Sequence, residues 1–186
     1  MTKYIRIVGG QWRRTSVDVP DVAGLRPTPD RVRETLFNWL QHLWQGEFAD
    51  KQVLDLFAGS GALGFEAASR GVAYVQMIEQ SPAAIASLRK LRDRLAAKNI
   101  RIHAGEAKKT LTRLDHTRFD LICLDPPFGQ QWFPGLLDDV LPLLNPHGLV
   151  YAEAEQVIAP PESYIALRQG RAGAVHYQLL QRREIT

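Results

Sequence analysis

Short apolar runs alternate with amphipathic segments over most of the chain. From residue 51 onward, continuous runs such as 53–57 and 119–124 alternate with segments in which apolar residues recur every three or four positions. The runs are typical of strands buried on both faces, and the recurring pattern is typical of helices packed against a sheet. The alternation predicts an α/β fold with a mostly parallel sheet. The expected strands cover residues 53–57, 74–78, 100–103, 119–124 and 148–152, followed by an antiparallel closing pair at 164–169 and 174–182.

Capping residues and apolar spacing predict the helices. Residues 62–70 follow a glycine turn, Ser81-Pro82 begins a second helix, and residues 133–144 contain a third that Pro142 interrupts. Thr28-Pro29 is expected to begin a further helix, with Thr28 as its cap. The buried stripe of that helix comprises Val32, Leu36, Leu40 and Leu43.

The N-terminal part lies outside this alternating pattern. Residues 4–8 and 12–19 predict a β-hairpin that Gly9-Gly10 interrupts, and an irregular linker follows at 21–27. We therefore expect two units, a hairpin with its linker (1–27) and a Rossmann-like domain (28–186). Because the predicted sheet is complete from residue 51 onward, we expect that it does not need the hairpin in order to fold.

A glycine-rich turn, Ala58-Gly59-Ser60-Gly61, separates the run 53–57 from the helix at 62–70. Strand, glycine turn and helix form the unit that holds a nucleotide-like ligand at the carboxyl end of a parallel strand. The glycine spacing also fits a dinucleotide site. Asp55 would repel a pyrophosphate, however, and suits a ligand with a positive end, such as S-adenosylmethionine. The candidate binding residues are Asp55, Phe57, Ala58, Gly59, Ser60 and Gly61.

A second motif, Asp125-Pro126-Pro127-Phe128, follows the run 121–124. Two adjacent prolines hold a rigid, extended backbone without N–H donors, so the Asp125 carboxylate and the Pro126 carbonyl are fixed as two acceptors. Two acceptors followed by a flat ring suit a planar base that carries an exocyclic NH2 group. All four residues are candidates for catalysis, and Asp125 is also a candidate for cofactor contact.

Glu79 ends the predicted strand 74–78 and follows the glycine turn at a spacing typical of nucleotide-binding folds. An acid at this position can accept hydrogen bonds from both ribose hydroxyls of a bound nucleoside. Glu79 and the adjacent Gln80 are therefore expected to contact the cofactor.

The two motifs together resemble the Rossmann-type S-adenosylmethionine-dependent amino-methyltransferases. The block Arg6-Ile7-Val8-Gly9-Gly10-Gln11-Trp12-Arg13, with segments 24–28 and 30–40, narrows the resemblance to the RsmD family, the bacterial 16S ribosomal RNA guanine-N(2) methyltransferases. This resemblance implies a seven-stranded sheet with an antiparallel last strand and S-adenosylhomocysteine as product. It also implies one guanine in 16S rRNA of the small subunit as substrate. Glu106-Ala107 is expected to contact adenine, although related methyltransferases often carry Asp in place of Glu106.

Two other functions stay open. A DNA adenine-N(6) methyltransferase would use the same Asp-Pro-Pro-aromatic motif, but the chain has no separate DNA-reading domain. A nucleotide-binding module without catalysis would leave Asp125 with a structural role, and the intact acceptor motif argues against this. A dehydrogenase is disfavoured because no hydride-transfer residues are recognisable.

Charge and composition indicate the partners. The chain has 186 residues and a formal net charge of +3, and its basic residues gather near the N-terminus and between residues 81 and 113. With one cysteine, no Cys/His cluster and no apolar run long enough for a membrane span, we expect a cytoplasmic monomer without a metal or a membrane partner. The candidate RNA-binding residues are Arg6, Trp12, Arg13, Arg14, Arg26 and Arg31, with the basic helix around Arg89 to Lys98 as an alternative surface.

Overall fold

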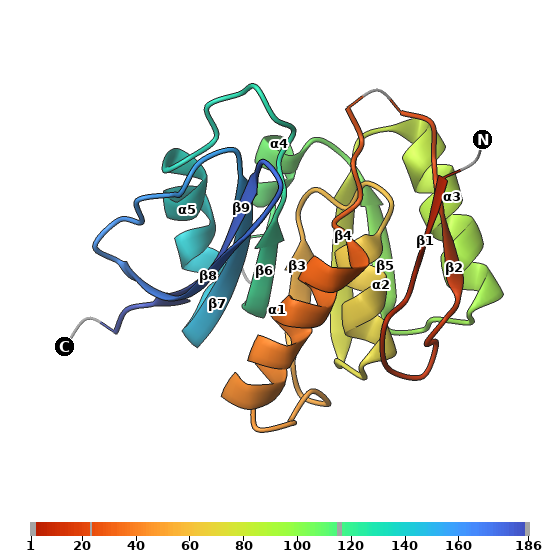
Figure 1. Ribbon diagram of the computed structural model, residues 1–186, viewed down its shortest axis with the longest axis horizontal. Helices are drawn as coiled ribbons and strands as arrows, with labels where there is room; N and C mark the ends of the chain where they lie inside the picture. Colours follow the sequence, from red (N-terminus) through yellow and green to blue (C-terminus); the bar gives the residue numbers. More distant parts are fainter. Residues whose placement is uncertain (1–2, 23, 115–116, 185–186) are drawn as a thin grey trace.

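Seven strands form one sheet (Figure 1). The strands are β3 (Gln52–Asp55), β4 (Tyr74–Glu79), β5 (Ile100–Ala104), β6 (Phe119–Leu124), β7 (Leu144–Ala154), β8 (Tyr164–Ala172) and β9 (Val175–Arg182). Their order is β5-β4-β3-β6-β7-β9-β8 in the computed structural model, which describes residues 3–22, 24–114 and 117–184. The first five strands in this order are parallel, whereas β9 is antiparallel to both neighbours. The predicted seven-stranded, mostly parallel sheet is confirmed.

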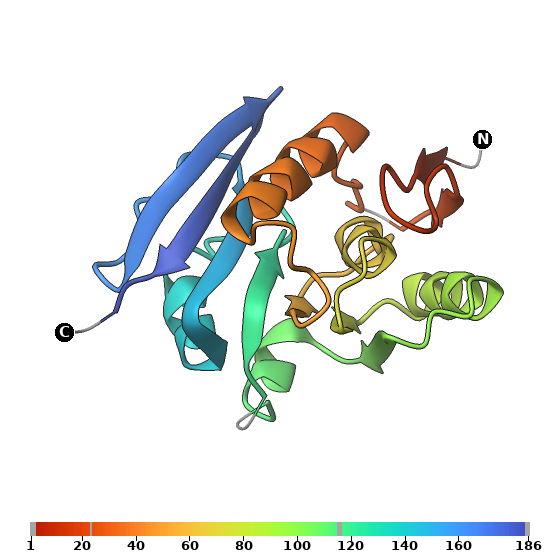
Figure 2. The ribbon, with the colours of Figure 1, turned by 90° about the horizontal axis from the view of Figure 1, so that it is seen from below.

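Helices cover both faces of the sheet (Figure 2). One face carries α1 (Asp30–Leu43), α2 (Ala62–Ser69) and α3 (Pro82–Arg94), and the other carries α4 (Ala107–Leu111), α5 (Gly135–Val140) and the short 3₁₀ helix η1 (Leu141–Leu143). Alternate residues of β3 divide accordingly, because Val53 joins the core on the first face and Leu54 joins the core on the second. Burial on both faces is the reason that the central strands read as continuous apolar runs.

The start of α1 differs from the prediction. Pro29 is the N-cap residue, with φ −59° and ψ 150°, and no side chain caps the helix. The Thr28 hydroxyl instead donates a hydrogen bond of 2.7 Å to Oε1 of Glu153. Thr28 is therefore not the cap, because its hydroxyl pairs with a buried carboxylate. By contrast, Ser81 caps α3 as predicted and accepts a hydrogen bond from the amide of Ala84.

The N-terminal hairpin packs onto α2. Its strands β1 (Lys3–Arg6) and β2 (Ser16–Val19) form a separate two-stranded antiparallel sheet. Ile7 and Val17 are each 1% exposed and belong to the same apolar core as α1 and α2. The Glu66 carboxylate of α2 accepts hydrogen bonds of 2.8 Å from the amides of both Val8 and Gly9. The hairpin thus shares the apolar core of the domain.

A buried arginine joins the hairpin to both helices. Arg33 of α1 is fully buried, and its guanidinium lies 3.5 Å from the Glu66 carboxylate. It also donates to the carbonyls of Arg6 and Thr28 and pairs with Asp30. A buried charge is tolerated only when it is paired and hydrogen-bonded, and this guanidinium meets both conditions. The predicted stripe of α1 is confirmed at Val32, Leu36 and Leu40, which are buried, whereas Leu43 is half-buried. The stripe did not include the buried Arg33.

Candidate active site

Four acidic residues come together at the carboxyl edge of the sheet. Asp55 and Glu79 are the last residues of β3 and β4, Asp125 directly follows β6, and Glu153 lies next to the end of β7. The four strands are adjacent and parallel, so their carboxyl ends meet at one edge. This edge is the place where open α/β sheets bind ligands. The structure therefore brings the predicted Asp55, Glu79 and Asp125 together and adds Glu153.

The glycine turn links β3 to α2. Gly59 and Gly61 have φ angles of 54° and 82°, which side chains rarely adopt. A Cβ at Gly61 would lie 2.6 Å from both Phe65 and Leu88, so only glycine fits there. Oδ2 of Asp55 accepts a 3.0 Å hydrogen bond from the amide of Gly64 in the first turn of α2. Burial raises the pKa of Asp55 to about 7.

Glu79 binds backbone amides of two loops. Its Oε2 accepts a 2.8 Å hydrogen bond from Gly59 of the glycine turn. Its Oε1 accepts hydrogen bonds from Gln80 and Ser81, at 2.9 and 2.7 Å. The acid thus fixes the glycine turn relative to the start of α3, which the predicted ribose-binding role did not include.

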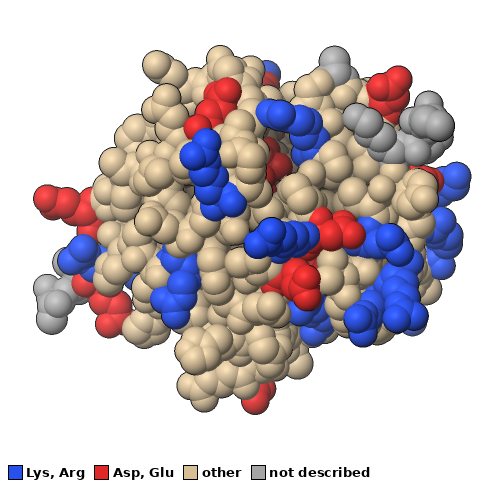
Figure 3. Space-filling view, viewed as in Figure 1, with Lys and Arg blue, Asp and Glu red and all other residues tan. Residues whose placement is uncertain are grey.

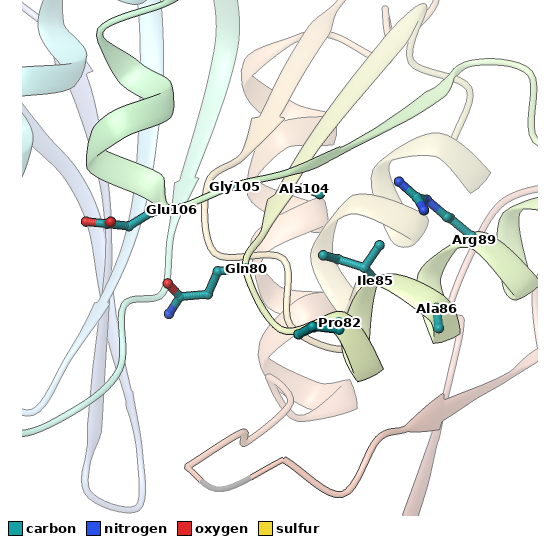
Figure 4. A pocket seen from close by; sticks show the side chains of 8 residues that line it. All are labelled: Gln80, Pro82, Ile85, Ala86, Arg89, Ala104, Gly105 and Glu106. Atoms are coloured by element: carbon teal, nitrogen blue, oxygen red, sulfur yellow. The ribbon is translucent and has the colours of Figure 1, made fainter.

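A cavity of about 540 Å³ opens beside the end of β4 (Figure 4). The first turns of α3 and the loop after β5 line it, and Pro82, Ile85 and Ala104 give it an apolar wall. The expected cofactor residues Gln80 and Glu106 also border the cavity. Figure 4 shows the Glu106 side chain pointing away from Ile85, and its carboxylate forms a 2.7 Å ion pair with Lys109.

The second motif follows β6 as predicted. Asp125 is half-buried, Pro126 is buried, Pro127 is exposed and Phe128 is half-buried. Burial, followed by the negative charges of Glu153 and Asp55, raises the pKa of Asp125 well above its usual range, and the cation of Arg26 opposes this shift. The loop beyond Phe128 is held to the end of the sheet, because the amide of Gly129 donates a 3.1 Å hydrogen bond to Glu155.

Among the expected RNA-binding residues, Arg26 reaches this motif. Its guanidinium carbon lies 4.6 Å from the centre of the Phe128 ring, a cation–π arrangement. Arg31 is exposed in the first turn of α1, and Arg6 is exposed on β1.

The other three expected RNA-binding residues lie away from the site. Trp12, Arg13 and Arg14 form the turn between β1 and β2, where the amide of Trp12 donates to the hydroxyl of Ser69. Because α2 begins at the glycine turn and ends at Ser69, this turn contacts the end of α2 that is distant from the carboxyl edge. The structure therefore separates these residues from Arg26.

Comparison with known proteins identifies the family. A family model described as "Conserved hypothetical protein 95" matches residues 5–181. The chain belongs to this family. This family is the RsmD family, which the sequence motifs of the chain resemble. Ribosomal RNA small subunit methyltransferase D of Escherichia coli is 42% identical over 187 residues, which cover 96% of this chain and 90% of that protein. The protein of the same name from Haemophilus influenzae is 35% identical over 189 residues, which cover 95% and 93%.

A solved structure extends the RsmD comparison to the fold. The structure described as "Putative methyltransferase yhhF from Escherichia coli" superposes with a TM-score of 0.84 and 40% sequence identity. The match covers 97% of this chain and 98% of the other. The chain therefore has the fold of an S-adenosylmethionine-dependent methyltransferase over nearly its whole length.

Sequence reasoning missed three residues of the site. Glu153 follows the apolar run 149–152, and the rule that located Glu79, an acid at a strand end, would have located it too. Thr28 was predicted to cap α1, and its contact with Glu153 was not predicted. Trp132 packs edge-on against Phe57, with ring centres 5.1 Å apart, and its Nε1 atom is buried without a hydrogen-bond partner among the described residues. No sequence pattern indicates that contact.

Metal-binding clusters and membrane-spanning helices are absent from the residues that the structure describes. Within residues 3–22, 24–114 and 117–184, no three His, Cys, Asp or Glu side chains are grouped so that they could hold a metal ion. No helix in these ranges is both long and apolar enough to cross a membrane.

Proposed function

We propose that the protein transfers a methyl group from S-adenosylmethionine to the exocyclic N(2) amine of one guanine in 16S ribosomal RNA. The observation that carries this proposal is the position of the Asp125 motif, which lies beside Asp55 and the glycine turn at one edge of a sheet with the RsmD family's fold. Many nucleotide-binding folds have a glycine turn, whereas the adjacent pair of rigid acceptors suits a substrate with an exocyclic amine.

The residues present fit S-adenosylmethionine. Its methionine part carries positive charge and suits the glycine turn beside the buried Asp55 carboxylate, where a pyrophosphate would be repelled. Its ribose suits Glu79, which keeps acceptor capacity beyond its three backbone hydrogen bonds. Its adenine suits the apolar wall formed by Pro82, Ile85 and Ala104.

The edge of adenine faces a different set of groups. Gln80 and Glu106 border the cavity, and Ala107 directly follows Glu106 in the chain. Because Lys109 holds the Glu106 carboxylate, we expect a backbone amide of this turn to recognise the adenine edge. Phe57, Ala58 and Ser60 complete the cofactor site from the side of the glycine turn.

Methyl transfer needs an activated amine, because the lone pair of an exocyclic nitrogen is delocalised into the base. The Asp125 carboxylate and the Pro126 carbonyl accept the two amine hydrogens and orient the lone pair, while Pro127 keeps the backbone extended. As the nitrogen becomes positive, both acceptors bind it more strongly, which stabilises the transition state. Asp125 then accepts the surplus proton or passes it to water. S-adenosylmethionine supplies the methyl group when bound, and Phe128 stacks on the target base.

We propose that residues 1–27 face the RNA and that residues 28–186 form the methyltransferase domain. Arg26 contacts Phe128 of the catalytic motif, and Arg31 lies in the first turn of α1. The remaining four residues would meet RNA further from the target base; they are Arg6, Trp12, Arg13 and Arg14. Figure 3 shows Lys and Arg side chains gathered on the part of the surface that carries the hairpin. The proposed substrate is the assembled small subunit in the cytoplasm, and the protein acts as a monomer.

Tritiated methyl transfer followed by nucleoside analysis tests this function. The protein is incubated with labelled S-adenosylmethionine and, in parallel, with small ribosomal subunits, naked 16S rRNA or DNA. The expected product is N(2)-methylguanosine from the subunits. Labelled N(6)-methyladenine in DNA would support the alternative function, and cofactor binding with no transfer to any substrate would support a module without catalysis.

A further inference from the structure

Glu153 is a buried acid beside the catalytic motif. In the parallel pairing of β6 with β7, Leu124 is opposite Ala152, so Asp125 and Glu153 follow at equivalent positions of neighbouring strands. Glu153 is only 3% exposed. Its Oε1 accepts a 2.7 Å hydrogen bond from the Thr28 hydroxyl and a 2.8 Å hydrogen bond from the Tyr151 phenol. These bonds compensate for the cost of burying the carboxylate.

The bond to Thr28 attaches the N-terminal linker to the sheet. We call residues 25–28 the strap. Thr28 is 3% exposed and lies between Pro27 and Pro29, which restrict its backbone on both sides. Figure 1 shows residues 24–29, which lead into α1, at the same end of the sheet as the loop that follows β6. A hydrogen bond at Thr28 therefore limits where the rest of the strap can lie.

The strap contacts both sequence motifs of the site. Arg26 lies over the ring of Phe128, with its guanidinium carbon 4.6 Å from the ring centre. Leu25 lies against the glycine turn, since a Cβ built on Gly59 would be 3.6 Å from Leu25 Cδ1. The strap therefore connects the glycine turn, the aromatic residue of the catalytic motif and Glu153.

On the basis of the proposed function, we propose that Glu153 is a positioning residue for methyl transfer. Its hydrogen bond to Thr28 holds the strap across the site, so that Arg26 keeps Phe128 in the orientation that receives the target base. Preorganised geometry lowers the barrier of the chemical step more than it tightens cofactor binding. Loss of the bond should therefore affect kcat, with little effect on the affinity for S-adenosylmethionine.

Thr28→Val and Tyr151→Phe form a matched pair that tests this role. Each removes one hydrogen bond from the same Glu153 oxygen, but only Thr28→Val releases the strap. We expect Thr28→Val to lower kcat about tenfold or more, with the S-adenosylmethionine Kd within about twofold of wild type. Tyr151→Phe should keep kcat within about threefold at a similar melting temperature. Thr28→Ser, which keeps the hydroxyl, should restore kcat.

Amide hydrogen exchange of the strap gives a readout that needs no RNA substrate. The Leu25 amide, which donates a 3.1 Å hydrogen bond to the Val22 carbonyl, should exchange about tenfold faster in Thr28→Val and at an unchanged rate in Tyr151→Phe. Unchanged exchange in Thr28→Val, or faster exchange with wild-type kcat, would contradict the proposal. Equal losses of kcat in both variants that follow the melting temperature would assign Glu153 to stability alone. If wild-type protein methylates no RNA, the proposed function fails, while the exchange data still decide whether Glu153 holds the strap.

Discussion

The Glu79 carboxylate binds the backbone amide of Gly59 at 2.8 Å, and this bond ties the second strand end to the glycine turn. The other Glu79 oxygen accepts from the amides of Gln80 and Ser81. A carboxylate has about four lone-pair positions, so these bonds leave room for a ribose hydroxyl. Glu79 therefore has two functions, because it shapes the cofactor site and also remains able to bind the cofactor.

Glu79→Ala should weaken S-adenosylmethionine binding by about 1–3 kcal/mol, because a ribose hydroxyl and the amides of two loops lose their acceptor. Isothermal titration calorimetry measures this change, and Glu47→Ala, at an exposed glutamate after α1, serves as control. Tight NADH binding without S-adenosylmethionine binding would overturn the cofactor assignment.

The affinity for S-adenosylmethionine should depend on pH through Asp55. Because burial raises its pKa to about 7, Asp55 is mostly protonated below that pH, and the positively charged ligand prefers the ionised form. The affinity should therefore fall as pH decreases below 7, by up to about tenfold per pH unit. Calorimetry between about pH 5.5 and 8.5 tests this, and Asp55→Asn should give weaker binding with a flatter profile. The same steep profile in the variant would exclude Asp55 as the responsible group.

Asp55 also makes the stability of the ligand-free protein depend on pH, but this stability falls as pH rises, whereas the affinity for S-adenosylmethionine rises. The pKa of Asp55 is 3.8 when unperturbed and about 7 in the folded protein, so the folded state holds an additional proton between these values. The Asp55 contribution to stability is present below pH 3.8 and is lost as pH rises through 7. In urea unfolding, Asp55→Asn should therefore gain stability relative to wild type as pH rises across this window. A difference that does not depend on pH would contradict the raised pKa.

Glu66→Ala should destabilise the protein by about 3–5 kcal/mol, because it removes one of the two carboxylates that pair with the fully buried Arg33. It also removes the acceptor for the amides of Val8 and Gly9, so the hairpin should detach at lower urea concentrations. Urea unfolding measures the loss, and Glu34→Ala on the exposed side of α1 is the control. An effect as small as that of the control would mean that the hairpin contributes little to the fold.

Replacing Arg13 and Arg14 with Ala should weaken binding of the ribosomal substrate and flatten its salt dependence. Each phosphate contact contributes about 0.9 or less to the log–log slope, and both side chains are exposed, so stability should change little. The test is a substrate titration at several salt concentrations, and Arg168→Ala with Arg171→Ala on β8 provides the control. An unchanged slope with a large loss of stability would move the RNA surface to the end of α3 and the residues that follow it, around Arg89 to Lys98.

Apolar patterning predicted the sheet well because the central strands are buried on both faces. The run 119–124 coincides with β6 at both ends, since its apolar residues alternate between the two helical layers. The two ligand motifs were located for a related reason, because glycines and prolines at strand ends have strict backbone requirements that local sequence expresses.

The polar contacts between distant segments were not predictable in this way. Thr28 looked like a helix cap because Pro29 follows it, but its hydroxyl pairs with Glu153, which lies 125 residues further along the chain. Arg33 was not part of the predicted buried stripe of α1, yet it is buried between the hairpin and α2. Such contacts depend on tertiary packing, which the periodicity of a single segment does not encode.

The most direct test of the account is methyl transfer by Asp125→Ala. The variant and an exposed control, Asp139→Ala, are assayed with small subunits and labelled S-adenosylmethionine, and the products are analysed as nucleosides. We predict that wild type and the control yield N(2)-methylguanosine. Asp125→Ala should lose transfer by about a hundredfold or more, with S-adenosylmethionine affinity within about threefold of wild type. Transfer by Asp125→Ala at the wild-type rate, or a labelled nucleoside other than N(2)-methylguanosine from the wild type, would contradict the account.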